Sequence, residues 1–337
     1  MAKLRIGVLY DYWWDEDEER VEGERPKKKS PDDDVQAVYE ALRKAGHNPV
    51  FVRIDGTRES LIELARSQTD LLFNLTESFA GDDGQDTNLA GYLELLGRRF
   101  TGSGSSGLYL AQDKNLAKKI FTFHGIHTPY FSTVYRGRTE HSHDIQFPVI
   151  VKPAREDGSI GIQFGAVCNS IKELMERIDY IHAEFDSPAL IEEYIEGREL
   201  YVGVLGNDKP EALPVVELDL SKLPEGTPKI AGTEVKWEEG TEIYRRTQPF
   251  FPDDLDEEVE AEIKQTAIAA YQALRLRDYG RIDIRLDGEG NAHVIEVNPN
   301  PWLLSTAEFA KAGKKSGRQH CQLIGEIVDL AMSRYGA

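Results

Sequence analysis

The chain has 337 residues, 40% hydrophobic and 29% charged, a composition typical of a soluble globular protein of two or three domains. Asp and Glu outnumber Lys and Arg by 59 to 40, and the net charge of −19 argues against nucleic acid or an anionic membrane as the main partner. The longest apolar runs are too short for a membrane-spanning helix, and the first residues predict no signal peptide. Cys168 and Cys321 lack metal-binding spacing and predict reduced thiols in a cytoplasmic protein.

Strands and helices alternate over the first hundred residues. The pattern predicts strands at 4–10, 49–54 and 70–75 and helices at 35–45, 59–67 and 87–96. Such alternation is typical of a parallel sheet covered by helices on both faces. Residues 11–34 form an unusually long polar connection, whose acidic block indicates a solvated loop. The aromatic residues Tyr12, Trp13 and Trp14 leave a lid role open.

Beyond residue 104 the alternation is replaced by a mixture of strands and helices. Ser170 and Glu173 form a capping box at the start of one helix. A second, longer helix is predicted at 255–275, and two helices end the chain. Further helix and strand patterns lie at 113–123, 147–152, 189–195, 198–205 and 211–220.

The strongest local signal is GRIDIRLDGEGNAHVIEVNPNP at 280–301, which predicts a hairpin turning at Asp-Gly-Glu-Gly. The alternation places Asp283 opposite Glu296 and Arg281 opposite Asn298. Two carboxylates and an amide oxygen at about 5 Å across a strand pair suit Mg²⁺, which prefers oxygen ligands. An ordinary solvated sheet face is the alternative; the rigid Asn-Pro-Asn-Pro exit, expected to aim Asn298 and Asn300 at one place, weakens it. The expected apolar face consists of Ile282, Ile284, Leu286, Ile295 and Val297.

Two weaker signals precede the hairpin. In VIVKPAREDGSIGI, at 149–162, a buried strand ends at Lys152 and a turn follows with Gly158, Ser159 and Gly161. Backbone N–H groups of such a turn can converge on phosphate oxygens, although it is not a Walker A loop and a structural hairpin is the alternative. In ALIEEYIEGRELYVGVLG, at 189–206, two short strands are joined through Glu-Gly-Arg-Glu, and an edge hairpin is the alternative.

In this order and spacing, the segments resemble the ATP-grasp superfamily, most closely its D-alanine–D-alanine ligase branch. The resemblance runs from FNLTESFAGDDGQDTNLAGYLELLGRRFTGSG at 73–104 through QDKNLAKK, VKPAREDGSIG, EEYIEGRE, EVKW, GRIDIRLD and EVNPNP. It implies a three-domain α/β ATP-grasp fold. The domains would be an N-terminal doubly wound parallel sheet at 1–111, a central α+β lid domain at 112–205 and a C-terminal α+β domain at 206–337. A homodimer is also implied.

The resemblance also implies site residues by position. The nucleotide positions are Lys114 and Lys152 for the ATP phosphates, Glu192, Glu193 and the backbone of Ile195 for adenine, and Glu199 for ribose. The turn at 156–162 matches a loop that closes over the phosphates, and its Ser159 is a candidate catalytic residue. Lys236 matches a lysine over the γ-phosphate, and Arg281 an arginine that stabilises the acyl phosphate and the tetrahedral intermediate. Asp283, Glu296 and Asn298 match the ligands of two Mg²⁺ ions, with Mn²⁺ as the alternative metal.

The first amino-acid subsite departs from the family pattern. The D-alanine ligases have a glycine-rich turn with a glutamate after the first strand, where this chain has residues 11–14 and the acidic stretch. That glutamate bonds to a serine and a tyrosine of the closing loops. Here the serine position is Gly158, beside Ser159, and the tyrosine position is Trp237.

The second subsite differs too. Pro301 is followed by Trp302 in place of a glycine, and Ala307 stands where a serine helps to place the second substrate. We therefore expect an ATP-dependent ligase that joins an amino-acid-like carboxylate to an amine through an acyl phosphate, releasing ADP and phosphate, with substrates other than two D-alanines. The alternatives are a D-alanine–D-alanine ligase of cell-wall synthesis, an ATP-dependent phosphotransferase, or a nucleotide-binding protein without activity, against which the retained Arg281 speaks.

Overall fold

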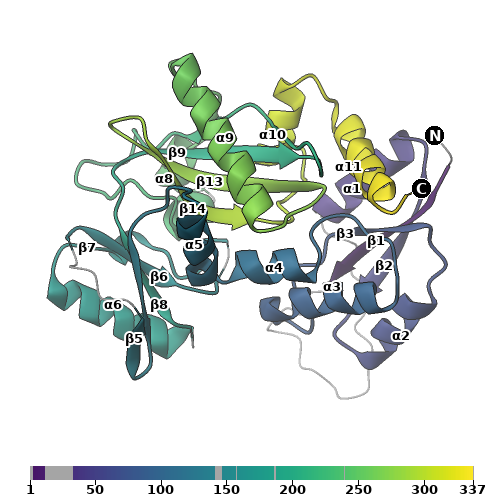
Figure 1. Ribbon diagram of the computed structural model, residues 1–337, viewed down its shortest axis with the longest axis horizontal. Coiled ribbons are helices and arrows are strands. Elements are labelled where there is room, and N and C mark those ends of the chain that lie inside the picture. Colours follow the sequence, from purple (N-terminus) through teal and green to yellow (C-terminus); the bar gives the residue numbers. More distant parts are fainter. Residues whose placement is uncertain are drawn as a thin grey trace.

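The computed structural model describes residues 3–11, 33–140, 146–156, 158–185, 187–238 and 240–336. Three β-sheets organise this part of the chain (Figure 1). A parallel N-terminal sheet lies on the same side of the molecule as both chain ends, and two antiparallel sheets lie on the other side. Tyr12, Trp13 and Trp14 fall outside the described residues, so their lid role stays a prediction.

The N-terminal sheet has the strand order β2-β1-β3, all parallel, as predicted. Residues of β1 alternate between its faces: Ile6 and Val8 pack in a core shared with α1 and α11, and Leu9 packs against α3. The sequence pattern missed α4. The elements are β1 (Arg5–Asp11), α1 (Asp33–Lys44), β2 (Asn48–Ile54), α2 (Arg58–Arg66), β3 (Leu71–Asn74), η1 (Asp83–Gln85), α3 (Asp86–Leu95), α4 (Ser105–Gln112) and, at the C-terminus, α11 (His320–Arg334).

The second sheet, called here the central sheet, has the order β5-β4-β8-β6-β7. Val149, Val151 and Ile191 point to one face, where they pack against α6. Because strand side chains alternate, Lys152 and Glu192 project from the opposite face. The Ser170 side chain accepts a hydrogen bond from the backbone N–H of Glu173, confirming the predicted start of α6. The elements are α5 (Lys114–Phe123), β4 (Phe131–Tyr135), β5 (Arg138–Glu140), β6 (Val149–Pro153), η2 (Phe164–Ala166), β7 (Val167–Cys168), α6 (Ile171–Glu184) and β8 (Ala189–Glu193).

The third sheet, called the large sheet, has the order β12-β11-β9-β13-β14, with β10 also on β9. Helix α9 lies across one face of it (Figure 1). The elements are β9 (Gly197–Leu205), β10 (Glu211–Ala212), β11 (Val216–Leu218), α7 (Thr233–Lys236), α8 (Glu242–Arg246), β12 (Pro249–Phe250), α9 (Glu257–Ala273), β13 (Tyr279–Asp287), β14 (Ala292–Asn298) and α10 (Glu308–Lys315).

The hairpin β13–β14 has the predicted register, with Arg281 opposite Asn298 and Asp283 opposite Glu296. One expectation is wrong. The register shifts after Asp283, so that Ile284 pairs with Val294, and Val294 rather than Ile295 belongs to the apolar face under α9. Ile295 instead lines the pocket described below. A bulge places one extra residue in a strand, which strict alternation cannot anticipate.

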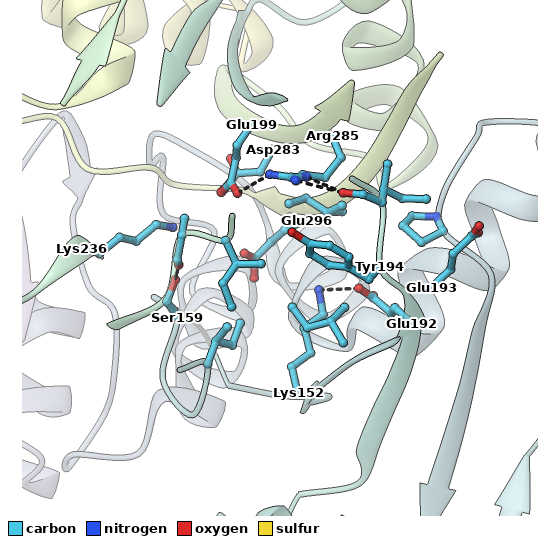
Figure 2. Close-up of a pocket in the computed structure, with 17 residues that line it drawn as sticks. Lys152, Ser159, Glu192, Glu193, Tyr194, Glu199, Lys236, Asp283, Arg285 and Glu296 are labelled. Atoms are coloured by element: carbon cyan, nitrogen blue, oxygen red, sulfur yellow. Dashed lines mark hydrogen bonds and ion pairs between the residues drawn. The ribbon is translucent and has the colours of Figure 1, made fainter. Parts of the chain in front are cut away.

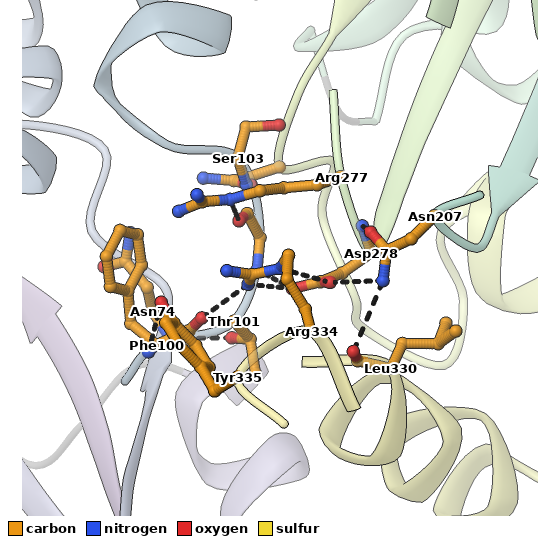
Figure 3. Close-up of polar contacts among 12 residues, drawn as sticks. Asn74, Phe100, Thr101, Ser103, Asn207, Arg277, Asp278, Leu330, Arg334 and Tyr335 are labelled. Atoms are coloured by element: carbon orange, nitrogen blue, oxygen red, sulfur yellow. Dashed lines mark hydrogen bonds and ion pairs between the residues drawn. The ribbon is translucent and has the colours of Figure 1, made fainter. Parts of the chain in front are cut away.

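A buried polar joint connects the N-terminal sheet to the large sheet (Figure 3). Asp278, fully buried, accepts hydrogen bonds from the backbone N–H of Gly102 at 2.8 Å and from Arg334 at 2.8 Å. Nearby, the Asn300 side chain accepts from the backbone N–H of Ser103 at 3.0 Å. Asn300 therefore anchors the loop after the N-terminal sheet, and the expectation that Asn298 and Asn300 converge on one place is wrong.

The three predicted domain ranges stay a prediction. Each sheet begins in its own range, but β9, which ends the range 112–205, pairs with β13 of the large sheet. Every helix within the described residues is too short or too polar to cross a lipid bilayer.

Candidate active site

A pocket lies between the facing sides of the central and large sheets (Figure 2). Two loops close it, one at 158–162 and one at 230–237, which are called here the first loop and the second loop. Charged side chains enter it from both sheets because successive side chains of a strand point to opposite faces of the sheet. The lining includes Ile150, Lys152, Ser159, Ile162, Glu192, Tyr194, Ile195, Glu199, Ala231, Lys236, Asp283, Arg285, Ile295 and Glu296.

On the central sheet, one carboxylate joins two lysines. Glu192 is buried, with its Oε1 2.9 Å from Lys118 Nζ and its Oε2 2.9 Å from Lys152 Nζ. Burial by itself would raise the pKa of Glu192, but the two lysines lower it, so the carboxylate is ionised. Burial lowers the pKa of Lys118 to about 8 against the attraction of Glu192. The group fixes the Lys152 ammonium at the pocket wall.

Lys118 was not among the predicted site residues. It lies on α5, one turn after Lys114, and its Nζ also donates to the Thr128 hydroxyl at 2.7 Å. The Thr128 hydroxyl in turn donates to the Val294 carbonyl at 2.8 Å, which ties this group to β14. The spacing of four residues along a helix was the available signal.

The predicted adenine and ribose positions meet at Arg285. Its guanidinium donates to the Ile195 carbonyl at 2.9 and 3.1 Å and to Glu199 at 3.3 Å (Figure 2). Glu199 also accepts a hydrogen bond from the buried Tyr201 hydroxyl at 3.1 Å. These contacts hold the carboxylate of Glu199 in the pocket, although Arg285 and Tyr201 had no predicted role. Glu193 also lines the pocket, at the hinge between the two sheets.

At the hairpin, two acidic residues are held by cations of the chain. Asp283 is bound by Arg281 through two hydrogen bonds, of 2.7 and 2.9 Å. Glu296 lies 2.6 Å from Lys114 Nζ, which also donates to the Glu156 carbonyl. Burial raises the pKa of Asp283 against the opposing charges of Arg281 and Lys236. Ion pairs of this kind oppose the effect of burial and favour the ionised carboxylate, the form that binds a metal.

The donor set fits a hard divalent cation. Asp283 and Glu296 face each other across the strand pair, and the Asn298 amide nitrogen donates to Asp283 Oδ1 at 3.2 Å. Within the described residues no three His, Cys, Asp or Glu side chains come together as a metal-binding group. A metal here would therefore use two carboxylates and an amide oxygen, with remaining positions left to water or phosphate oxygens.

The two closing loops are bonded to each other. The Ser159 hydroxyl donates to the Ala231 carbonyl at 2.9 Å, and Ser159 adopts a left-handed backbone with φ of +66°. The Trp237 indole N–H donates to the Gly158 carbonyl at 2.6 Å. The resemblance matches Gly158 and Trp237 to the family's serine and tyrosine, and in this structure the two residues contact each other. Because its hydroxyl is bonded to Ala231, Ser159 lies at the pocket as a loop-closing residue.

Beside the pocket, acidic groups gather at the carboxyl end of the N-terminal sheet. The Asp11 carboxylate is buried and accepts hydrogen bonds from the Ser78 hydroxyl at 2.6 Å and its N–H at 2.8 Å. Burial, with repulsion from Glu156, Asp11 and Asp82, raises the pKa of Asp83 to about 6. Burial raises the pKa of Asp86 to about 6 as well. The carboxyl end of the N-terminal sheet therefore carries closely spaced acidic groups.

The comparisons with known proteins agree with this architecture. The family model "D-ala D-ala ligase C-terminus" matches residues 120–329. A solved structure of the D-alanine–D-alanine ligase from Bacillus anthracis in complex with ATP superposes with a TM-score of 0.70, at 21% identity, over 98% of both chains. That similarity confirms the predicted three-domain ATP-grasp fold.

Two relatives resemble the chain over most of its length. An uncharacterized protein, y4sG, of Sinorhizobium fredii is 32% identical over 89% of this chain and 88% of its own length. The D-alanine–D-alanine ligase of Bordetella petrii is 33% identical over 88% of this chain and 86% of its own length.

Proposed function

The chain belongs to the D-alanine–D-alanine ligase family of ATP-grasp amino-acid ligases. We propose that it joins a carboxylate to an amine and that its two substrates are not both D-alanine. The reaction would run through an acyl phosphate and release ADP and phosphate. One observation carries the proposal: Lys152 and Glu296 line the pocket and Lys114 pairs with Glu296, whereas the first amino-acid subsite departs from the family pattern. There Gly158 and Trp237, which contact each other, match the serine and tyrosine that bond to the family's glutamate.

The residues supply the needs of phosphoryl transfer. ATP brings about four negative charges, and Lys114, Lys152 and Lys236 provide positive charge at the pocket wall and at its second loop. When bound, Mg²⁺ held by Asp283, Glu296 and Asn298 would neutralise phosphate charge. Lys114, Lys152, Asp283 and Glu296 are each held by an ion pair within the chain, so their positions are largely set before the nucleotide binds.

Arg281 would act in the second half of the reaction. Burial lowers its pKa, but the charges of Asp283 and Glu308 outweigh that effect and raise it, so the guanidinium is positively charged. Such a cation stabilises negative charge that develops on the carbonyl oxygen when the amine attacks. The bonded loops over the pocket, through Ser159 and Trp237, would keep water away from the acyl phosphate.

The test is release of ADP with ATP and Mg²⁺ over a panel of carboxylates, which includes D-alanine and the L-amino acids, with and without amines. Hydroxylamine added in place of the amine traps an acyl phosphate as a hydroxamate. The proposal expects a hydroxamate with at least one donor and an amide, seen by mass spectrometry, when an amine is present. If neither product forms with any donor, the proposal is overturned. A stable phosphorylated product would identify a phosphotransferase instead.

The alternative with specific support is D-alanine as donor and acceptor, because the Bordetella petrii relative carries that name. Formation of D-alanyl-D-alanine at a rate above all other pairs would establish it. A homodimer and a cytoplasmic location belong to the same proposal, and light scattering of the purified chain tests the dimer.

A further inference from the structure

The guanidinium of Arg281 is occupied on both of its edges. Nε and Nη2 donate to the two oxygens of Asp283, at 2.7 and 2.9 Å. Nη1 lies 3.6 Å from an oxygen of Glu308. The aromatic ring of Tyr201 lies 5.1 Å from the guanidinium carbon. A substrate group that approaches Arg281 from the edge of Nη1 therefore meets the carboxylate of Glu308.

Of the charged side chains around Arg281, that of Glu308 is the most exposed to solvent. The side chain of Asp283 is 2% exposed and that of Arg281 is 15% exposed, whereas the Glu308 side chain is 28% exposed. Arg281 is paired with Asp283 through one edge of its guanidinium and is less exposed than Glu308. Of these three charged groups, the carboxylate of Glu308 is thus the most accessible to an incoming acceptor.

Glu308 also begins α10, where an acidic residue is favourable because helix N-termini carry partial positive charge. The same N-terminus is a place where a substrate carboxylate could bind to free N–H groups. Ala307, the residue before the helix, has no side-chain group that could bind a carboxylate. Glu308 occupies this favourable field itself and repels a second carboxylate.

We propose that Glu308 makes the acceptor site selective for amines without a carboxylate beside the reacting nitrogen, such as amino-acid amides or the amines formed when amino acids are decarboxylated. The inference rests on the proposed ligase function and names the substrate class of its second subsite. A carboxylate placed near Glu308 is disfavoured by like-charge repulsion in a partly buried site, while an ammonium group is attracted.

The chemical step is the same for either acceptor. The nitrogen attacks the acyl carbon, the carbon–nitrogen bond forms, and the carbon–oxygen bond to phosphate breaks. Phosphate leaves with the electron pair of that bond, and the ammonium gives up two protons to solvent in becoming an amide. Glu308 acts on which amine enters and needs no part in the bond changes.

The experiment compares three related acceptors: D-alanine, its amide D-alaninamide and its decarboxylated counterpart ethylamine, with the L enantiomers of the two chiral compounds. The donor is the carboxylate that gives the fastest hydroxamate formation, and kcat/KM is measured for each acceptor. We expect the kcat/KM of the wild-type chain to be about tenfold or more higher for alaninamide, or for ethylamine, than for alanine of the preferred configuration. In Glu308→Gln we expect this preference to fall by about tenfold, mainly because the KM for alanine falls.

Glu257→Gln is the matched control, because Glu257 is an acidic residue in the first turn of α9. It removes the same charge from a helix start and should leave the preference unchanged. Glu308→Asp keeps the charge but withdraws it from Arg281, and should give an intermediate preference. This variant also tests the inference if Glu308→Gln does not fold.

Three results separate the inference from the ligase proposal. Hydroxamate formation with a wild-type preference for free alanine would overturn the role of Glu308 and leave the ligase standing. The same holds if Glu308→Gln or Glu308→Asp kept the wild-type preference unchanged. Absence of hydroxamate and amide with every donor would overturn both proposals.

Discussion

The nucleotide end and the acceptor end of the pocket hold their functional groups in different ways. At the nucleotide end, Glu192 and Lys118 are each 1% exposed, and Glu192 pairs with both Lys118 and Lys152. At the acceptor end, the Glu308 side chain is 28% exposed. In the second loop, Trp237 is 54% exposed. Removing one member of a buried charge pair leaves the other uncompensated, which costs far more than changing an exposed side chain. We therefore expect substitutions at the buried end to cost more than substitutions at the exposed end, where the proposed amino-acid subsites lie.

The largest effect should come from the nucleotide end. Glu296→Gln removes one carboxylate of the proposed metal site while keeping size and leaving Asp283 bonded to Arg281. We expect ADP release to fall by about a hundredfold to a thousandfold with every acceptor. Steady-state assays over the acceptor series measure it, and an unchanged thermal midpoint controls for the fold. Activity within tenfold of the wild type would show that Glu296 is no metal ligand.

Asp283→Asn is a poorer test of the same point. Asp283 is 1% exposed and neutralises the buried Arg281, so the variant leaves an uncompensated guanidinium and should lose about 3–5 kcal/mol of stability.

A smaller effect is expected at the second loop, between the two ends. Lys236, on α7, places its Nζ 5.7 Å from the centre of the Tyr201 ring and lines the pocket. Lys236→Ala should lower kcat by about tenfold to a hundredfold and change the KM for ATP little, since a closing-loop residue acts mainly in the transition state. Titration of ATP at saturating donor separates the two constants. A large rise in KM with unchanged kcat would place Lys236 among the ATP-binding residues instead.

A change at Trp237 should affect coupling rather than rate. Trp237→Phe keeps an aromatic ring but removes the N–H group that donates to Gly158 at 2.6 Å. Looser loops would admit water to the acyl phosphate, so we expect the ratio of ADP released to amide formed to rise by about two- to fivefold. Trp237→Ala should raise the ratio further. An unchanged ratio in both variants would show that this hydrogen bond does not keep the pocket closed.

The smallest expected effect concerns the acidic groups near Asp83. The pKa of Asp83 is raised from 3.8 to about 6, so between these values the folded chain holds a proton that the unfolded chain lacks. This contribution to stability is present at low pH and is lost as the pH rises through 6. Asp83→Asn should therefore stabilise the chain by about 1 kcal/mol at about pH 8 and by little at about pH 4.5. Thermal midpoints at both pH values measure the difference; equal shifts would exclude repulsion at Asp83 as the cause.

The sequence by itself determined the elements whose patterns are local. Alternation on both sides of a tight turn specified the register that places Asp283 opposite Glu296, because the turn and the period of two leave few other pairings. The capping residues at Ser170 and the regular alternation of strands and helices likewise predicted α6 and the parallel sheet.

Only the tertiary structure decided which residues contact each other between segments far apart in the chain. The contacts between Lys118 and Glu192, between Trp237 and Gly158 and between Arg281 and Glu308 each join elements at least 27 residues apart. The bulge that moves Ile295 into the pocket is another such feature. Burial and charge pairing depend on the packing of whole sheets and loops, and local periodicity carries no information about which distant side chain completes a pair.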